Sequence, residues 1–138
     1  SIRAAFEAAS ARPEPWTASA YDLVLTDKRD RRPKFATLAI MREVSVPSAH
    51  SDQLVRWLST DAGYTNGEYA CCPVAEPPNA LGIRLTRGSV MLDFVIQCGQ
   101  VALGRPPSFD NATQTETGTL SKALVSFLES LHKSPCSR

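Results

Sequence analysis

The sequence predicts an α+β fold in which helices pack on one face of a single antiparallel β-sheet of about four or five strands. Three observations lead to this prediction. Apolar residues recur at helical spacing in three segments, apolar and polar residues alternate between them, and neighbouring strands are joined by short connections. Because 138 residues are enough to bury one core, we expect residues 1–138 to form a single globular domain.

The first and last helices are predicted from their apolar spacing. Residues 2–9 place apolar side chains on one face, and the proline-rich stretch 13–15 ends this helix. Residues 120–131 keep an apolar stripe along their whole length, and Thr119 is the expected N-cap. Both helices are therefore expected to lay one apolar face on the sheet.

A middle helix is predicted after Pro47. Ser48 is its expected N-cap, because a serine hydroxyl can accept a hydrogen bond from a free N–H of the first turn. Leu54 and Leu58 lie one turn apart on the same face. Gly63 is the expected C-terminal stop, since glycine tolerates a positive φ.

The first two strands are predicted at residues 20–25 and 35–46. The polar segment 27–33 joins them, so antiparallel pairing is expected. Residues 64–80 contain an Asn-Gly pair and several prolines, which is typical of a loop.

A β-hairpin is predicted around Gly88-Ser89, with glycine at the first turn position as a type II′ turn prefers. Counting outward from the turn gives a register that pairs apolar residues on one face and opposite charges on the other. A further strand is predicted at residues 100–103, followed by a loop over 104–118. The predicted hairpin pairs are Leu85 with Leu92, Ile83 with Phe94, Leu81 with Ile96, and Arg84 with Asp93.

Composition argues against two kinds of partner. The formal net charge is +1, without the basic excess typical of proteins that bind nucleic acid. The longest apolar run, residues 90–96, contains Asp93 and is far shorter than the roughly 18–20 residues of a membrane helix. No signal-peptide pattern opens the chain. We expect a cytoplasmic protein because its few cysteines suggest free thiols, with an export leader already removed as the open alternative.

The four cysteines are too few for a disulfide scaffold, and we expect free thiols in a reducing compartment. However, Cys98 lies opposite residue 79 in the predicted hairpin, so it can approach Cys71 and Cys72. A thiol or zinc site using Cys71, Cys72 and Cys98 is therefore an alternative. The chain lacks the C-x-x-C spacing typical of zinc sites, and in the main interpretation we expect no metal and no other cofactor.

Sequence motifs give little support to an enzyme. The chain has no Gly-x-Ser-x-Gly elbow, no phosphate-binding glycine pattern and no dinucleotide-binding pattern. A small hydrolase or isomerase that uses His50 or His132 with an acid remains a second alternative. Asp93 is the acid that interrupts an apolar strand, and its simplest explanation is a structural ion pair with Arg84.

Aromatic residues near the predicted loops suggest a binding surface, because exposed aromatic side chains often anchor partners. Trp57 lies off the apolar stripe of its helix, so it either faces outward or widens the buried face. The predicted patch combines the 64–80 loop with the open face of the hairpin. Its candidate residues are Trp57, Tyr64, Tyr69, Arg84 and Asp93.

Several short motifs follow one another between residue 35 and the last helix. They are Cys71 or Cys72, Pro78, Gly82-Ile83-Arg84-Leu85 and Asp93-Phe94-Val95-Ile96. In this order they resemble a group of small uncharacterised bacterial proteins, whose corresponding strand carries Cys-Phe-x-Cys. Here Gln97 and Gln100 occupy the two cysteine positions and Cys98 occupies the phenylalanine position. The resemblance implies a related fold and no particular activity.

Taken together, the sequence favours a protein of unknown function that is a non-enzymatic binding or protein-interaction domain. Its expected partner is another protein or a small apolar ligand, and assembly as a homodimer is also predicted. These expectations follow from the missing catalytic motifs and from the aromatic residues near loops.

Overall fold

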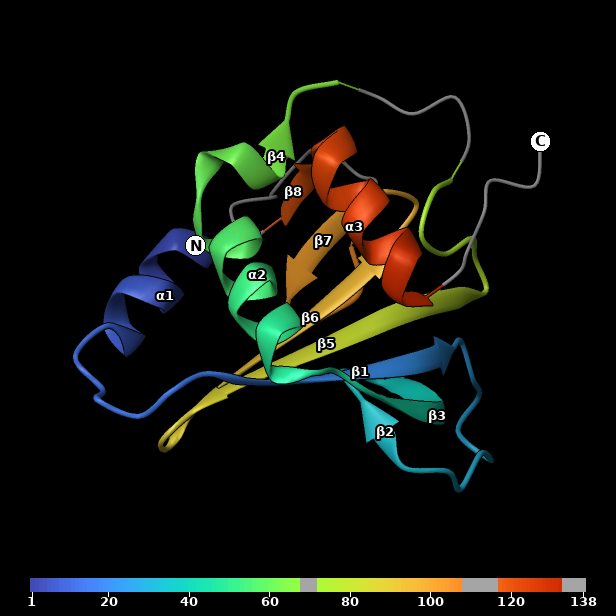
Figure 1. Cartoon of the computed structure of the whole chain (residues 1–138). Helices are drawn as coiled ribbons and strands as arrows, with labels where there is room; N and C mark the ends of the chain where they lie inside the picture. The colour runs from blue at the N-terminus through green and yellow to red at the C-terminus, as the bar shows by residue number, and fades with distance from the viewer. Residues whose placement is uncertain (68–71, 108–116, 133–138) are drawn as a thin grey trace.

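The computed structural model describes residues 1–67, 72–107 and 117–132, apart from the side chains of Ser45, Thr117 and His132. Runs of strands follow one another between the helices, as is typical of an α+β domain (Figure 1). In chain order the elements are α1 (Ile2–Ala9), β1 (Thr17–Val24), β2 (Lys34–Phe35), β3 (Leu38–Ser45), α2 (Ser48–Ser59), the 3₁₀ turn η1 (Asp61–Gly63), β4 (Tyr64–Thr65), β5 (Asn79–Arg87), β6 (Val90–Gln97), β7 (Gln100–Leu103), β8 (Thr117–Leu120) and α3 (Lys122–His132).

The strands form one open antiparallel sheet in the order β2-β3-β1-β5-β6-β7-β8-β4. The predicted α+β class and the single antiparallel sheet are therefore confirmed. The sheet has eight strands, whereas four or five were expected. The additional strands are mostly short: β2 and β4 have two residues each and β8 has four, too few to produce a clear alternating pattern.

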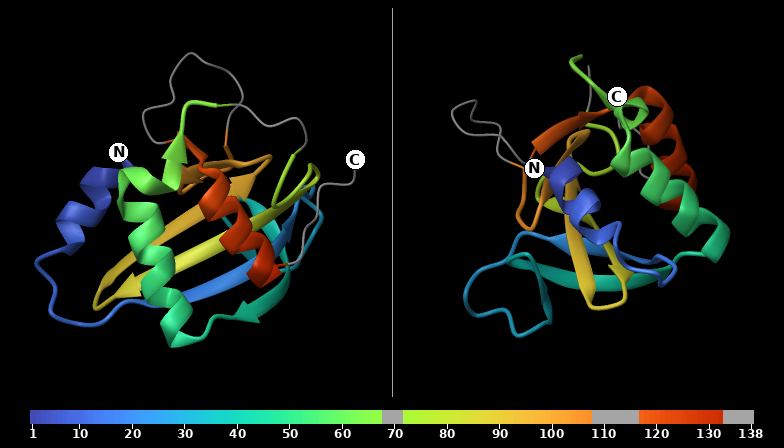
Figure 2. Two further views of the ribbon diagram at one scale, coloured as in Figure 1. Left: turned by 45° about the horizontal axis from the view of Figure 1, so that its top comes forward. Right: turned by 90° about the vertical axis from the view of Figure 1, so that its left-hand side faces the viewer.

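One face of the sheet carries the helices, as predicted. Figures 1 and 2 show α2 and α3 lying across this face, with α1 beside α2. Each helix contributes to the same apolar core, which we call the helix-side core. Its buried helical members are Phe6 of α1, Leu54 and Leu58 of α2, and Leu124, Val125 and Leu128 of α3.

The predicted hairpin register is confirmed at each position. β5 and β6 pair Leu85 with Leu92, Ile83 with Phe94, Leu81 with Ile96 and Arg84 with Asp93. Gly88 has a φ of +59°, as the first position of a type II′ turn requires. The apolar members of these pairs lie in the helix-side core, so burial and turn geometry select the same register.

The predicted strand 35–46 is wrong in one respect, because it is a hairpin of β2 and β3. The chain turns at Ala36 and Thr37, whose φ angles are +48° and +75°. Two successive positive φ values suit a type I′ turn, which usually contains Asn or Gly. Since neither residue is typical there, the sequence carried no turn signal.

Both predicted N-caps are wrong. Ser48 is the first residue of α2, Pro47 precedes it, and no side chain caps this helix. At α3 the cap is Ser121, whose hydroxyl accepts a hydrogen bond from the N–H of Leu124 at 3.2 Å. Thr119 instead belongs to β8, which pairs with β7 and β4. The residues of β8 were predicted to be the end of a loop and the start of the last helix.

The predicted C-terminal stop of α2 is also wrong. The helix ends at Ser59, and Gly63 is buried in the following η1 turn. A Cβ on Gly63 would lie 2.0 Å from the backbone oxygen of Trp57. Close packing against α2, and not helix termination, therefore explains this glycine.

Candidate functional site

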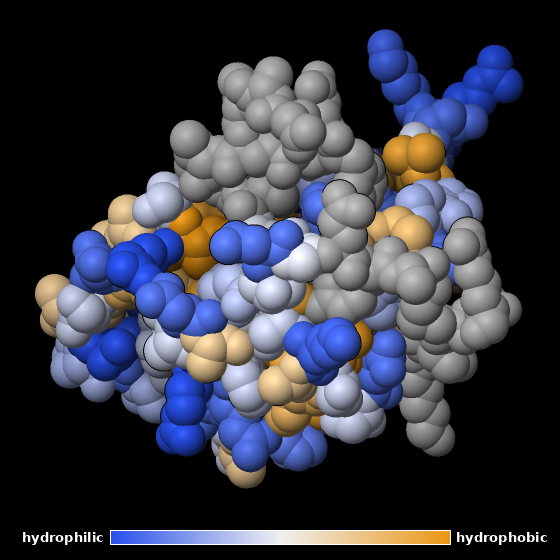
Figure 3. Space-filling view, turned by 90° about the horizontal axis from the view of Figure 1, so that it is seen from above, coloured by the Kyte–Doolittle hydropathy of each residue, from blue (hydrophilic) through white to orange (hydrophobic). Residues whose placement is uncertain are grey.

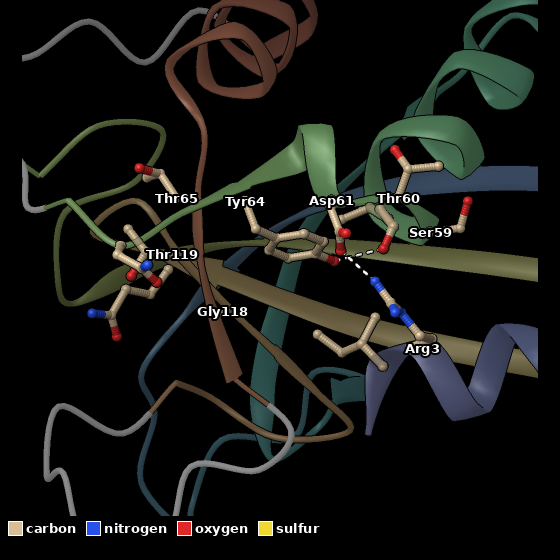
Figure 4. Close-up of a pocket in the computed structure, with 12 residues that line it drawn as sticks. Arg3, Ser59, Thr60, Asp61, Tyr64, Thr65, Gly118 and Thr119 are labelled. Atoms are coloured by element: carbon tan, nitrogen blue, oxygen red, sulfur yellow. Dashed lines mark hydrogen bonds and ion pairs between the residues drawn. The ribbon is translucent and has the colours of Figure 1, made fainter.

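A hollow with a volume of about 470 Å³ lies at the edge of the sheet where β4 pairs with β8 (Figure 4). In Figure 4, Thr65 and Thr119 lie on one side of β8, and Tyr64, Asp61 and Arg3 lie on the other. Neutral polar side chains make up most of the lining. The lining residues are Ile2, Arg3, Leu58, Ser59, Thr60, Asp61, Tyr64, Thr65, Asn66, Gln100, Gly118 and Thr119.

Tyr64 is held in place by its neighbours and is not free to react. Its hydroxyl donates a 2.6 Å hydrogen bond to the backbone oxygen of Leu58, and burial raises its pKa above the usual value. Its ring rests against Gly118, where a Cβ would lie 2.6 Å from Cδ1 of the ring. The glycine thus makes room for the aromatic wall of the hollow.

An ion pair between Arg3 of α1 and Asp61 of η1 crosses the rim (Figure 4). Both side chains are largely exposed, with relative accessibilities of 64% and 90%. Exposed ion pairs contribute roughly 0–1 kcal/mol of stability, so this pair can open at little cost. The two charges also balance each other at the mouth of the hollow.

A second hollow of about 610 Å³ adjoins the first and shares Arg3, Ser59, Thr60 and Asp61 with it. Its other walls come from α1, α2, the segment before β1 and the end of β5. These further residues are Phe6, Glu7, Ser10, Trp16, Val55 and Arg87. We call the two hollows together the edge groove, with the Arg3–Asp61 pair lying between its halves.

One lining residue of each half of the edge groove has a buried polar atom without a hydrogen-bond partner among the residues that the structure describes. Oε1 of Gln100 is the acceptor in the first half, and Nε of Arg87 is the donor in the second. The Arg87 guanidinium also lies over the ring of Trp16, 5.7 Å from its centroid. Buried polar groups are nearly always paired in folded proteins, so each exception calls for an explanation.

The predicted site residues Arg84 and Asp93 lie elsewhere, on the sheet face away from the helix-side core. Arg84 donates two hydrogen bonds to the carboxylate of Asp93, at 2.8 and 3.0 Å. Its guanidinium lies over the rings of Tyr21 and Phe35, 5.7 and 5.2 Å from their centroids. The hydrogen bond to Asp93 raises the pKa of Arg84. We call this arrangement the outer-face cluster; its polar atoms satisfy one another.

The sequence-predicted binding residues therefore do not form one patch. Tyr64 lines the edge groove, Arg84 and Asp93 belong to the outer-face cluster, and Trp57 is half-buried against the helix-side core. Tyr69 lies outside the described residues. The packing of Trp57 follows the expectation that it widens the buried face of its helix.

A disulfide joins Cys72 to Cys98, so the expectation of free thiols is wrong for these two residues. The prediction that Cys98 can approach this segment is confirmed for Cys72. Cys98 occupies the β6–β7 turn, and its N–H donates to the backbone oxygen of Ala75 at 2.8 Å. The segment after Cys72 is thus fastened to the turn that immediately precedes Gln100.

The disulfide also excludes Cys72 and Cys98 as zinc ligands, because sulfurs in a disulfide are not thiolates and do not bind zinc. Cys71 lies outside the described residues. Within the described ranges, no three His, Cys, Asp or Glu side chains gather in a way that would hold a metal ion.

His50 packs its ring edge-on against Phe127 of α3, with the ring centroids 5.8 Å apart. Its Nδ1 is buried and has no hydrogen-bond partner among the described residues. No ion pair or hydrogen bond to an acid is recorded for it in that part of the chain, so it lacks the partner expected of a catalytic base. The side chain of His132 lies outside the described residues.

Sequence reasoning missed Gln100, Arg87, Arg3 and Asp61. A glutamine at the start of a strand and an arginine at its end are ordinary surface residues in a sequence. Only the pairing of β7 with β8 and the docking of α1 near η1 bring them to one groove.

Comparisons with known proteins add no assignment: no family model, curated protein or solved structure significantly matches the chain. The resemblance to the small bacterial proteins thus remains a prediction. In residues 1–67, 72–107 and 117–132, the helices lack the length and apolar character needed to cross a bilayer. Fold and groove together define an α+β domain with an open eight-stranded antiparallel sheet and a polar groove at one edge.

Proposed function

We propose that this protein is a non-enzymatic binding domain whose ligand occupies the edge groove. The observation that carries the proposal is the unpaired, buried Oε1 of Gln100 at a hollow lined mainly by neutral polar side chains. The volume of about 470 Å³ falls within the roughly 300–1,000 Å³ of small-molecule sites. A ligand that donates a hydrogen bond to Gln100 would remove the cost of leaving that acceptor unpaired.

A catalytic role has less support at this site. Among the described residues that line the first half, the groups that could act on a proton are Tyr64 and Asp61; the first donates to a backbone oxygen and the second is paired with Arg3. Catalysis needs a base or nucleophile within reach of its substrate and in the right protonation state. Burial raises the pKa of Tyr64 further above neutral pH, which makes its hydroxyl a poorer base or nucleophile.

A small apolar ligand is also less well supported than a polar one. An apolar cavity lies between α3 and the sheet, lined by Leu81, Ile83, Leu128 and others, and has a volume of about 20 Å³. That is the space of about one water molecule. On the face seen in Figure 3, apolar areas are small and lie among hydrophilic residues, whereas docking surfaces for apolar partners are usually broad.

The disulfide bears on the proposed compartment. The cytoplasmic expectation depended on free thiols, and disulfides persist mainly in oxidising compartments. The Cys72–Cys98 bond therefore favours the alternative of an exported protein. We include this location in the proposal.

The proposal is tested by NMR with the disulfide-bonded chain and a library of fragment-sized alcohols, amides and carboxylates. Binding in the edge groove predicts amide shift changes at Asn66, Gln100 and Thr119. The amides of Arg84 and Asp93 serve as the internal control and should not move. If binding fragments shifted the outer-face cluster instead, or if no fragment shifted the edge groove, the proposal would be rejected.

A further inference from the structure

We infer that the ligand of the edge groove is an uncharged, hydroxyl-rich molecule, namely a short neutral oligosaccharide. This inference rests on the proposed binding function and adds the chemical class of the ligand. It follows from three features of the groove: the two unpaired buried atoms, the balance of charge, and the aromatic side chains in the second half.

The two unpaired atoms require opposite partners. Oε1 of Gln100 needs a hydrogen-bond donor, and Nε of Arg87 needs an acceptor. A carboxylate or phosphate could serve Arg87 but could not donate to Gln100, and an ammonium group could do only the reverse. A hydroxyl group donates and accepts at once, so a ligand that carries several hydroxyls satisfies both atoms.

The charges of the groove do not favour an ion. In the first half, the charged residues among the described lining are Arg3 and Asp61, which pair with each other. In the second half, Arg87 is accompanied by the acidic Glu7. The remaining polar lining consists of hydroxyl and amide side chains, which match sugar hydroxyls in both donor and acceptor roles. These residues are Ser59, Thr60, Tyr64, Thr65, Asn66, Gln100 and Thr119 in the first half and Ser10 in the second.

The second half also offers aromatic surface. Trp16 is half-buried, meets Phe6 edge-on at 5.7 Å between ring centroids, and lines the hollow together with it. Aromatic rings pack well against apolar surfaces while leaving their edges in water, and the C–H faces of sugar rings are such surfaces. The two halves are continuous, because they share four lining residues that include the exposed Arg3–Asp61 pair. A continuous groove suits a chain of sugar rings better than a single ring.

The experiment exposes the full disulfide-bonded chain to an array of neutral and acidic glycans. Any binder is then titrated in solution by Trp fluorescence and by NMR amide shifts. We expect a neutral glycan to bind and to shift Gln100, Thr119 and residues beside Trp16. Gln100→Leu should weaken binding about tenfold, the effect of losing one good hydrogen bond in a buried setting.

A matched variant separates recognition from folding. Gln97 pairs with Gln100 across the β6–β7 hairpin but does not line the groove, so Gln97→Leu should leave affinity within about twofold. Arg87→Met should weaken binding as Gln100→Leu does, because it removes the unpaired donor and keeps the stem. Urea unfolding of each variant shows whether a loss of affinity reflects a loss of fold.

The outcomes distinguish this inference from the proposed function. If only acidic glycans bound, or if a charged fragment bound the groove and no neutral glycan did, the ligand class would be wrong while the binding function stood. If no neutral glycan bound, the inference would be rejected. If neither glycans nor fragments bound the groove, both proposals would fail.

Discussion

The arginines of the outer-face cluster and of the edge groove differ in their hydrogen bonding, although Arg84 and Arg87 come from the same strand, β5. Arg84 has a carboxylate partner and two aromatic rings, and its hydrogen bonds to Asp93 are short and paired. Arg87 has a ring contact and a buried Nε without a partner in the described chain. A charged side chain in a protein is therefore no sign of a site by itself. The unmet hydrogen bond is the more informative feature.

The largest effect that we predict concerns the disulfide beside the edge groove. Replacing both Cys72 and Cys98 by serine should lower the free energy of unfolding by roughly 3 kcal/mol, because the bond closes a loop with a sequence separation of 26. Urea unfolding measures this change. The amide of Gln100 should shift more than that of Arg84; equal shifts would mean that the bond does not support the groove in particular.

The next effect concerns the wall of the groove. Gly118→Ala should cost about 1–3 kcal/mol, because the new methyl group would overlap the Tyr64 ring. In a Tyr64→Ala background the same substitution should cost much less, since the overlapping atoms are gone. Thermal or urea unfolding of the four chains gives the coupling, and additive costs would contradict the contact.

A smaller effect contrasts the two arginines directly. Arg84→Met leaves the Asp93 carboxylate unpaired and should cost about 1–2 kcal/mol, a modest value because the pair is partly exposed, at 30% and 22%. Arg87→Met removes a donor that had no partner and the contact with the Trp16 ring, so it should lower stability by less than about 1 kcal/mol. If urea unfolding showed that both variants lose the same free energy of unfolding, the two arginines would not differ in the way proposed.

The smallest effect is expected in the exposed loop between β1 and β2. Asp30 accepts hydrogen bonds from the Arg32 side chain, the Thr26 hydroxyl and the Arg32 backbone, and these hold its pKa far below the usual value. Its contribution to stability is thus present above the unfolded-state pKa of about 3.9 and is lost as the pH falls through the folded-state value.

Melting temperatures of the wild type and Asp30→Asn check this prediction. The wild type should be the more stable protein at pH 7, and the difference should shrink as the pH approaches 2. A difference that stayed constant over this range would show that the ionised carboxylate is not the source of the effect.

The sequence by itself determined the elements whose signals are local. The apolar stripe of α3, the helix of residues 2–9 and the register of the β5–β6 hairpin follow from the side-chain periods of 3.6 and 2, which the chain repeats along these segments. The pairing of Arg84 with Asp93 followed from the same register. A shift by one residue would have moved apolar side chains into water.

Only the tertiary structure decided the rest. The strands β4 and β8 are imposed by pairing with segments that lie far away in the sequence, and such short strands carry no clear period. The turn at Ala36-Thr37 joins the adjacent strands β2 and β3, but its residues carry no turn signal. The partner of Cys72 likewise depends on where the β6–β7 turn falls.

The edge groove is the clearest case of a feature decided in three dimensions. Gln100 and Arg87 have many possible partners in an unfolded chain, and whether a buried atom finds one depends on what every packed neighbour has already bonded. Hydrogen bonding between residues distant in sequence has no local signal. The candidate site therefore emerged only after the sheet was assembled.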